Sequence, residues 1–303
     1  MIPSAHAAGG TVSSSHSRRA AVIGSPIGHS RSPALHRAAY HHLGLDCSYE
    51  AIEVTPQDLG RVVDQVRADP AWCGLSVTMP HKRALVELVD QLSPQAAVLG
   101  VLNTVTIDGA GPDRILTGHN TDVAGIVGAL RYGGVASAPS SAVILGGGGT
   151  AAASLGALHL LGADQATVVV RSTERAAALQ DLGRTLDLRV ELSEWSGVMD
   201  RVQNADVVIS TLPPRGADEL ARELRATVPP PAPSPPVLLD VAYDPWPSAF
   251  AGVWESRGGV IVPGLEMLIY QAVEQVRLFS AGAFTDHSGV LKVMCDAVGA
   301  PPR

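Results

Sequence analysis

The sequence predicts an α/β protein with two sheet-containing domains. Short apolar segments alternate with segments of helical length from residue 19 to residue 134, and a second alternating block begins at residue 141. This alternation is typical of largely parallel sheets covered by helices. With 303 residues and 46% apolar composition, the chain is long enough for two domains and apolar enough to fill two cores.

The first block reads as an N-terminal α/β domain. Apolar runs predict strands at residues 20–24, 47–54, 74–79 and 102–108. The segments between and after them predict helices at residues 33–45, 56–69, 82–90 and 121–134. The second of these helices shows the pattern most clearly, with apolar residues at Leu59, Val62, Val63 and Val66.

The second block has the length and pattern of a doubly wound domain. It predicts strands at residues 141–146, 166–171, 206–211, 236–243 and 259–264, with helices after the first two and around 216–226 and 247–257. A final helix at 265–282 is expected to return to the first block. We therefore expect an extension at 1–18, a discontinuous domain of 19–122 with 265–303, and a second domain at 123–264.

Charge and cysteine usage exclude several functional classes. The chain has 22 Lys and Arg against 29 Asp and Glu, a net charge of −7, which argues against nucleic acid or an anionic membrane as the main partner and favours a small-molecule substrate. The three cysteines lack metal-ligand spacing, so we expect no bound metal and no disulfide framework. With no secretory signal, this favours a cytoplasmic protein. The sequence leaves open whether the protein forms a homodimer.

A proline-dense segment at residues 228–236 has two interpretations. We expect a solvent-exposed insertion, because its prolines lack backbone donors and its composition is of low complexity. The alternative is a docking site for a partner that recognises proline motifs.

A glycine-rich loop in the second block predicts a dinucleotide site. Gly146, Gly148 and Ala151 satisfy G-x-G-x-x-A between a predicted strand and a predicted helix. A pyrophosphate needs backbone without side chains at a helix N-terminus, and this loop offers it. The loop also contains Gly147, Gly149 and Thr150. The alternative is a glycine-rich turn with no ligand.

The end of the next predicted strand favours NADP over NAD. Instead of the acid that binds a ribose diol, the chain has Arg171, followed by Ser172, Thr173 and Arg175. Guanidinium groups bind phosphate oxygens in two-point geometry, so this loop suits a 2′-phosphate. The alternative is a solvated helix N-terminus with two surface arginines.

Polar side chains also follow the apolar runs of the first block, where α/β folds place ligand sites. They lie in SPIGHSRSP (25–33), SVTMPHK (76–82), LNT (102–104) and HNTD (119–122). Ser30 and Ser32 precede a helix and could grip a carboxylate or merely cap the helix. Lys82, Asn103 and Asp122 are candidates for the site, although each taken alone could be a solvated loop residue.

Taken together, these motifs resemble the shikimate dehydrogenase family. GSPIGHSRSP, SVTMPHK, LNT, NTD, GGGGTA and GLEMLIYQA occur in the family's order from about Arg19 to about Ala281. The resemblance implies an N-terminal α/β substrate domain, a Rossmann domain for NADP, and reversible reduction of 3-dehydroshikimate to shikimate with NADPH. This reaction is a step in the route to chorismate and the aromatic amino acids.

The resemblance also implies roles for single residues. Ser30 and Ser32 would bind the substrate carboxylate, with Tyr243 as a third contact. The ring hydroxyls would be held by Lys82, Asn103, Asp122 and Gln271, with Thr78 nearby, and Gly264 would complete the cofactor site. Hydride addition to a ketone leaves negative charge on the oxygen, so we favour Lys82 as proton donor and Asp122 as its orienting partner. The sequence leaves open which of the two transfers the proton, because they can titrate as a coupled pair.

Three positions depart from the family pattern. Ser76 and Val170 stand where many relatives have Asn, and Ser248 stands where Thr is common, which retains a hydroxyl. His81, beside Lys82, is expected to be a bystander.

Two alternatives to a shikimate dehydrogenase stay open. The nearer one is a paralogue that acts on quinate or an aminated shikimate, and the other is a non-catalytic sensor. A sensor has no need for both Lys82 and Asp122.

Overall fold

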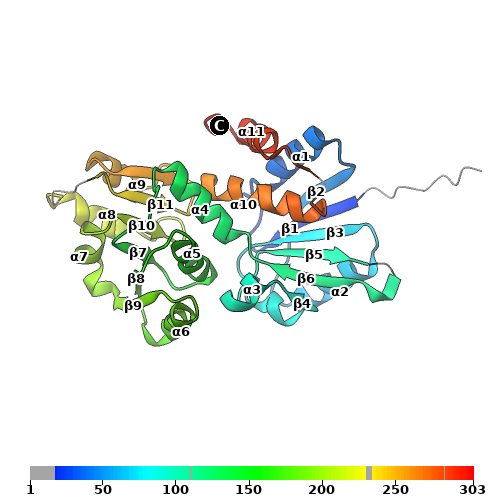
Figure 1. Cartoon of the computed structure of the whole chain (residues 1–303), viewed down its shortest axis with the longest axis horizontal. Coiled ribbons are helices and arrows are strands. Elements are labelled where there is room, and N and C mark those ends of the chain that lie inside the picture. The colour runs from blue at the N-terminus through cyan, green and yellow to red at the C-terminus, as the bar shows by residue number, and fades with distance from the viewer. Residues whose placement is uncertain (1–17, 110, 230–233, 283) are drawn as a thin grey trace, which may run out of the picture.

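The computed structural model describes residues 18–303 except 110, 230–233 and 283, and it has two lobes joined by long helices (Figure 1). Arg18, which we expected in the N-terminal extension, is instead the first residue of strand β1 (Arg18–Gly24). Its backbone N–H donates to the carbonyl of Asp46 and its guanidinium donates to that of Phe279. The rest of the predicted extension and the centre of the proline-dense segment lie outside the described residues.

The first sheet contains six described strands in the order β2-β1-β3-β5-β6-β4. Beyond β1, these are β2 (Cys47–Glu53), β3 (Trp72–Val77), β4 (Gln91–Leu92), β5 (Thr104–Asp108) and β6 (Ile115–His119). Strand β1 is parallel to β2 and β3, whereas β5 is antiparallel to β3 and β6.

Strand β1 shows how this sheet forms two cores. Successive side chains of a strand point to opposite faces, so Ala20 and Val22 join one apolar cluster while Ala21 and Ile23 join another. Helix α2 (Leu59–Ala68) covers the second face. The first face is covered by α1 (Ser32–Leu43), α10 (Gly264–Phe279) and α11 (His287–Val298).

The second sheet confirms the predicted doubly wound fold. All its described pairings are parallel. Its strand order is β12-β11-β10-β7-β8-β9, so the chain runs outward from the centre in both directions and the order reverses between β7 and β10. The strands are β7 (Ala142–Leu145), β8 (Gln165–Val170), β9 (Arg189–Glu194), β10 (Val207–Ser210), β11 (Val237–Asp240) and β12 (Val260–Pro263).

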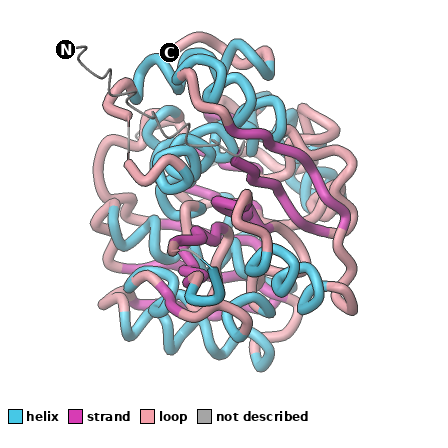
Figure 2. Tube along the Cα trace, turned by 90° about the vertical axis from the view of Figure 1, so that its right-hand side faces the viewer, coloured by secondary structure: helices cyan, strands magenta, loops and turns pink. Residues whose placement is uncertain are grey.

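Helices cover both faces of this sheet, and in Figure 2 helices lie on both sides of the strands. One face packs against α4 (Asp122–Tyr132), α5 (Gly149–Leu160) and α6 (Ala177–Thr185). The other packs against α7 (Val198–Gln203), α8 (Asp218–Arg225) and α9 (Ala249–Ser256). None of the described helices is long and apolar enough to cross a membrane.

Helices α4 and α10 pack against each other between the two lobes (Figure 1). Their close approach depends on small residues: a methyl group on Gly125 would lie 2.7 Å from the carbonyl oxygen of Met267, and one on Gly128 would lie 2.5 Å from the ring of Tyr270. Met267 belongs to the cluster of the second sheet, whereas Ile269 belongs to that of the first. The predicted return of this helix to the first lobe is thus supported, and the exact domain division stays a prediction.

Residues 82–90 do not form the predicted helix. Only a short 3₁₀ turn is present at Ala84–Glu87, with Leu85 buried. The carbonyl of Lys82, which would accept a helical hydrogen bond, accepts instead from the backbone N–H of Leu102 at 3.0 Å. The contact with the segment that precedes β5 therefore overrides the local helical pattern.

Candidate active site

Lys82 and Asp122 form an ion pair between the lobes. Lys82 lies in the loop after β3, and Asp122 is the first residue of α4. The Lys82 ammonium donates to Asp122 Oδ2, and the two side chains are 16% and 5% exposed. The backbone N–H of Asp122 donates to the side chain of Asn120 at 3.1 Å. A partly buried cation held against a carboxylate suits proton donation to a developing oxyanion.

Asn103 joins this ion pair to helix α10. Its Nδ2 donates to Asp122 Oδ1 at 2.8 Å and to Gln271 Oε1 at 3.2 Å. Its Oδ1 accepts from the backbone N–H of Thr121 at 2.7 Å. The hydroxyl of Thr121 also lies 3.1 Å from Gln271 Oε1. Sequence reasoning missed Thr121, although it lies within the HNTD segment that pointed to Asp122.

The two candidate serines lie on the loop between β1 and α1. Ser30 Oγ accepts from the backbone N–H of Ser32 at 3.3 Å, so it contributes to the start of the helix, while Ser32 is 4% exposed. Burial raises the pKa of the Tyr243 hydroxyl, and the nearby backbone of Arg31 opposes this rise. The loop after β11 therefore lies beside the loop that carries both serines.

Thr78 connects the same region to the lysine loop. Its backbone N–H donates to the carbonyl of Ile23 at 2.9 Å, and its methyl group lies against Gly24. Next to the lysine, His81 is 1% exposed and its Nε2 lies 2.7 Å from the Val54 carbonyl oxygen. His81 thus anchors the loop, and among the described residues no hydrogen bond joins it to the Lys82 side chain.

His36 packs under the serine loop and gives the fold a dependence on pH. Its ring stacks on Tyr49 at a centroid separation of 3.8 Å, and its Nδ1 lies 2.9 Å from the carbonyl oxygen of Ser32. Burial lowers the pKa of His36 from 6.5 to about 4. The ring is therefore neutral in the folded protein at pH 6, while an unfolded chain takes up a proton below pH 6.5.

Protonation of His36 is therefore expected to favour unfolding. The free energy of unfolding should fall by up to about 3 kcal/mol as the pH drops from 6.5 to 4, because the unfolded state binds the extra proton. Urea unfolding of the wild type and of His36→Gln at several pH values isolates this contribution. An equal pH dependence in both proteins would contradict the assignment.

The glycine-rich loop lies between β7 and α5 with the geometry of a phosphate-binding turn. Gly146 has φ +106°, a conformation that favours glycine, and a side chain there would meet Thr211 Oγ1 at 2.5 Å. Gly148 is the N-cap of α5 and has open space around the position of a side chain. The free N–H groups of a helix N-terminus attract anions.

The glycine-rich loop also adjoins the ion pair. A methyl group on Gly149 would lie 3.5 Å from the side chain of Val101 and 3.8 Å from Cβ of Lys82. The structure thus brings together the predicted nucleotide loop and the predicted catalytic lysine, which are 67 positions apart in the sequence.

The arginine loop follows β8 at the same edge of the sheet. Arg171 and Arg175 are exposed, and their guanidinium groups have no hydrogen-bond or ion-pair partner among the described residues. The backbone N–H of Arg175 donates to Ser172 Oγ at 3.4 Å, so the loop turns back between Ser172 and Arg175 as it enters the 3₁₀ turn at Glu174–Ala176. Val170 is buried, and its side chain lies 3.0 Å from the position of a methyl group on Gly147.

Ser248 retains the contacts expected of a hydroxyl at this position. Its Oγ donates to Asp240 Oδ2 at 2.6 Å and accepts from the backbone N–H of Ala251 at 3.0 Å, which caps α9. Gly264, at the first position of α10, approaches the backbone of Val241 so closely that a side chain would collide with it. Both contacts hold the segment that carries Tyr243.

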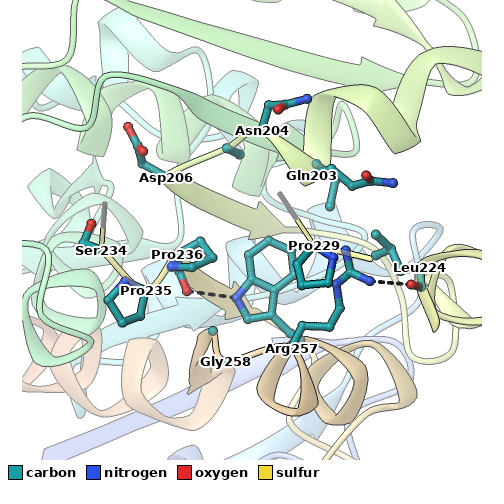
Figure 3. A pocket seen from close by; sticks show the side chains of 14 residues that line it. Gln203, Asn204, Asp206, Leu224, Pro229, Ser234, Pro235, Pro236, Arg257 and Gly258 are labelled. Carbon is teal, nitrogen blue, oxygen red and sulfur yellow. Dashed lines mark hydrogen bonds between the residues drawn. The ribbon is translucent and has the colours of Figure 1, made fainter. Parts of the chain in front are cut away.

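A cavity of about 410 Å³ lies at the opposite end of the second sheet (Figure 3). It is lined by residues that precede β10, β11 and β12, among them Asp206, Pro236 and Gly259. Two of its polar groups are already paired: the indole N–H of Trp254 donates to the Pro236 carbonyl, and Arg257 donates to the Leu224 carbonyl. Because doubly wound sheets bind nucleotides at the carboxyl ends of their strands, this cavity is not the candidate site.

Fold and site together define a class of protein: a two-domain, dinucleotide-dependent oxidoreductase with a lysine–aspartate pair beside the nucleotide loop. Residues 22–105 match the family model described as the shikimate dehydrogenase substrate binding domain. The chain is 35% identical to the NADP(+) shikimate dehydrogenase of Dinoroseobacter shibae over 258 residues, which cover 84% of this chain and 88% of that protein. The chain belongs to the shikimate dehydrogenase family.

Solved structures agree with this assignment. Shikimate dehydrogenase from Mycobacterium tuberculosis is 38% identical, with a TM-score of 0.78 over 92% of this chain and 99% of that one. Shikimate 5-dehydrogenase from Thermus thermophilus, solved in complex with NADP(H) and shikimate, is 30% identical, with a TM-score of 0.73 over 92% of this chain and 99% of that one. The predicted fold class and family are confirmed.

Proposed function

We propose that the protein is an NADP-dependent shikimate dehydrogenase that interconverts 3-dehydroshikimate and shikimate. The observation that carries the proposal is the Lys82–Asp122 pair, which lies beside the glycine-rich loop and is held by Asn103. The family membership reported above supports the same reaction. The proposed reaction belongs to the route to chorismate and the aromatic amino acids.

On the substrate side, the proposal divides the site into two parts. Ser30, Ser32 and Tyr243 would bind the carboxylate, since Arg31 lies between the two serines in the sequence and its backbone is near the Tyr243 hydroxyl. A second group would hold the ring hydroxyls, namely Lys82, Asn103, Asp122 and Gln271, with Thr78 nearby. The hydrogen bonds among Asn103, Asp122 and Gln271 support this grouping.

Lys82 would donate the proton. When bound, NADPH supplies the hydride, and the carbonyl oxygen that receives the electron pair needs a proton to become a hydroxyl. The Lys82 ammonium can give that proton, and Asp122 Oδ2 holds the ammonium in place. In the reverse direction, the same amine accepts the proton of the substrate hydroxyl.

The residues at the edge of the second sheet fit a bound NADP. The open space at Gly148 leaves room for a pyrophosphate at the start of α5, and Arg171 and Arg175 are free to bind a 2′-phosphate. The cofactor-binding group would comprise Gly146, Gly147, Gly148, Gly149, Thr150, Ala151, Arg171, Ser172, Thr173, Arg175 and Gly264.

A cytoplasmic location and a homodimer belong to the proposal as well. Cys47, Cys73 and Cys295 are free thiols, which supports a reducing compartment. Light scattering of the purified protein tests the homodimer, because the mass of two chains would support it and the mass of one chain would contradict it.

Steady-state oxidation assays test the proposed function. Shikimate and quinate are each combined with NADP and with NAD, and we expect shikimate with NADP to give the highest kcat/KM. Higher kcat/KM with quinate would identify the paralogue instead. Cofactor binding without turnover of either acid would identify a sensor.

Ser30→Ala is expected to raise the KM for shikimate with little change in kcat. The carboxylate is remote from the reacting carbon, so its contacts are equal in the ground state and the transition state. Losing one charge-assisted hydrogen bond should raise KM about tenfold or more. Ser48→Ala, on the exposed strand β2, is the control. A steep fall in kcat with unchanged KM would show that Ser30 does not bind the carboxylate.

A further inference from the structure

Gln275 lies in the core of the first lobe and has no role in the reaction proposed above. It is one helical turn beyond Gln271 on α10 and is 1% exposed. Burying a primary amide is costly unless its donors and its acceptor are paired. The partners of Gln275 therefore indicate its role.

The Gln275 amide bridges two neighbouring strands. Its Oε1 accepts from Ser76 Oγ at 2.8 Å, and its Nε2 donates to Thr104 Oγ1 at 3.0 Å and to the Asn103 carbonyl at 3.3 Å. Ser76 on β3 and Thr104 on β5 are opposite each other in the antiparallel ladder. Ser76 accepts in turn from the buried hydroxyl of Tyr49 at 2.7 Å.

The single proton of the Thr104 hydroxyl gives this bridge a direction. Thr104 Oγ1 accepts from Gln275 Nε2 and donates its proton to Asn103 Oδ1 at 2.9 Å, which is closer than the other possible acceptor, Thr121 Oγ1, at 3.4 Å. The other end of that amide, Nδ2, then faces Asp122 Oδ1 at 2.8 Å. Every bond from Tyr49 to Asp122 therefore runs from donor to acceptor in the same direction, which strengthens each of them.

We propose that Gln275 is a positioning residue that, acting through Thr104 and together with the backbone N–H of Thr121, fixes the orientation of the Asn103 amide and so holds the Asp122 carboxylate against Lys82. If the Asn103 amide were reversed, its oxygen would face the carboxylate oxygen of Asp122 and repel it. Gln275 opposes this reversal by directing the Thr104 proton toward Asn103 Oδ1. The inference rests on the proposed function in one respect, the role of the Lys82–Asp122 pair in proton transfer.

A double-mutant cycle tests this proposal. Gln275→Met removes the amide at similar volume, and Thr104→Val removes the hydroxyl that transmits its effect. We expect each variant to lower kcat/KM for shikimate about tenfold, with the KM for NADP changed less than twofold. Because both act through one chain of bonds, the double variant should lose about tenfold and not about a hundredfold. Additive losses, or unchanged kcat/KM in either single variant, would overturn the proposal.

Two further variants separate positioning from folding. Val276→Ala creates a cavity in the same core, and we expect a lower melting temperature with unchanged kcat/KM. Gln275→Glu keeps the acceptor for Ser76 but has a donor for Thr104 only while its carboxyl is protonated, so its kcat/KM relative to the wild type should fall as the pH rises. A fall in kcat/KM for Val276→Ala, or a ratio of Gln275→Glu to wild-type kcat/KM that does not change with pH, would indicate a merely structural role.

The test does not depend on the identity of the substrate. Wild-type turnover of shikimate tests the proposed function. The double-mutant cycle instead compares the kcat/KM of each variant with that of the wild type, and it can use any hydroxy acid that the wild type oxidises. The side-chain amide NMR signals of Asn103 give a readout without turnover. They should shift in Gln275→Met and Thr104→Val and stay in place in Val276→Ala, and unchanged signals in the first two variants would contradict the proposal.

Discussion

Replacing Lys82 with alanine is expected to lower kcat by about 100-fold or more while the dissociation constant for NADP changes little. The lost ammonium stabilises charge that develops on the substrate oxygen only in the transition state, and general acid catalysis contributes about 10²–10⁴-fold. Lys82 adjoins the nucleotide loop through Gly149, but its ammonium is bound to Asp122 and not to that loop. Stopped-flow turnover and fluorescence titration with NADPH measure the two quantities.

The control for Lys82→Ala is Lys292→Ala, which removes an equal charge from an exposed pair with Asp296 on α11. This control should retain wild-type kcat. Near-normal kcat of Lys82→Ala would show that Lys82 is not the proton donor. A loss of NADP affinity as large as the loss of kcat would show that the lysine binds the cofactor instead.

Arg171→Ala is expected to raise the KM for NADP about ten- to a hundredfold with little change in the use of NAD. A charge-assisted hydrogen bond contributes about 1.5–3 kcal/mol, which corresponds to that range of affinity. Arg171 is exposed at the carboxyl end of β8 and has no partner in the described part of the chain, so the change leaves other contacts intact. Kinetics with both cofactors at saturating shikimate measure the effect.

Arg184→Ala is the matched control for this prediction. Arg184 lies on α6 and pairs with Asp181 on the protein surface, so its removal changes the net charge equally without touching the arginine loop. A wild type that used NAD as efficiently as NADP would contradict the phosphate site. If Arg171→Ala raised the KM for NADP and for NAD equally, the arginine loop would be a solvated surface segment and not a phosphate site.

Much of the fold could be predicted because its strands are buried on both faces. Residues 142–145 and 207–209 are continuous apolar runs that are buried throughout. Strand β9 was missed because it lies at an edge and has only Val190 and Leu192 as apolar residues. Strand β6 was missed for a similar reason, since only Ile115 and Leu116 are apolar and Ile115 is exposed. Helix α11 also escaped prediction.

The site could be predicted where single residues carry recognisable chemistry, as Lys82 and Asp122 do. Thr104 and Gln275 act through hydrogen bonds between segments that lie 171 positions apart, and no local pattern reveals such a contact. One signal was present in retrospect. Gln271 and Gln275 are spaced by one helical turn on the apolar face of α10, where an amide needs a polar partner.

A crystal structure of the protein with shikimate and NADP tests the central claim most directly. The account predicts the shikimate carboxylate within hydrogen-bond distance of Ser30 and Ser32, and the hydroxyl that is oxidised within hydrogen-bond distance of Lys82 Nζ. The 2′-phosphate of NADP should contact Arg171. A carboxylate bound at Lys82, with the reacting hydroxyl turned toward the serines, would contradict the account.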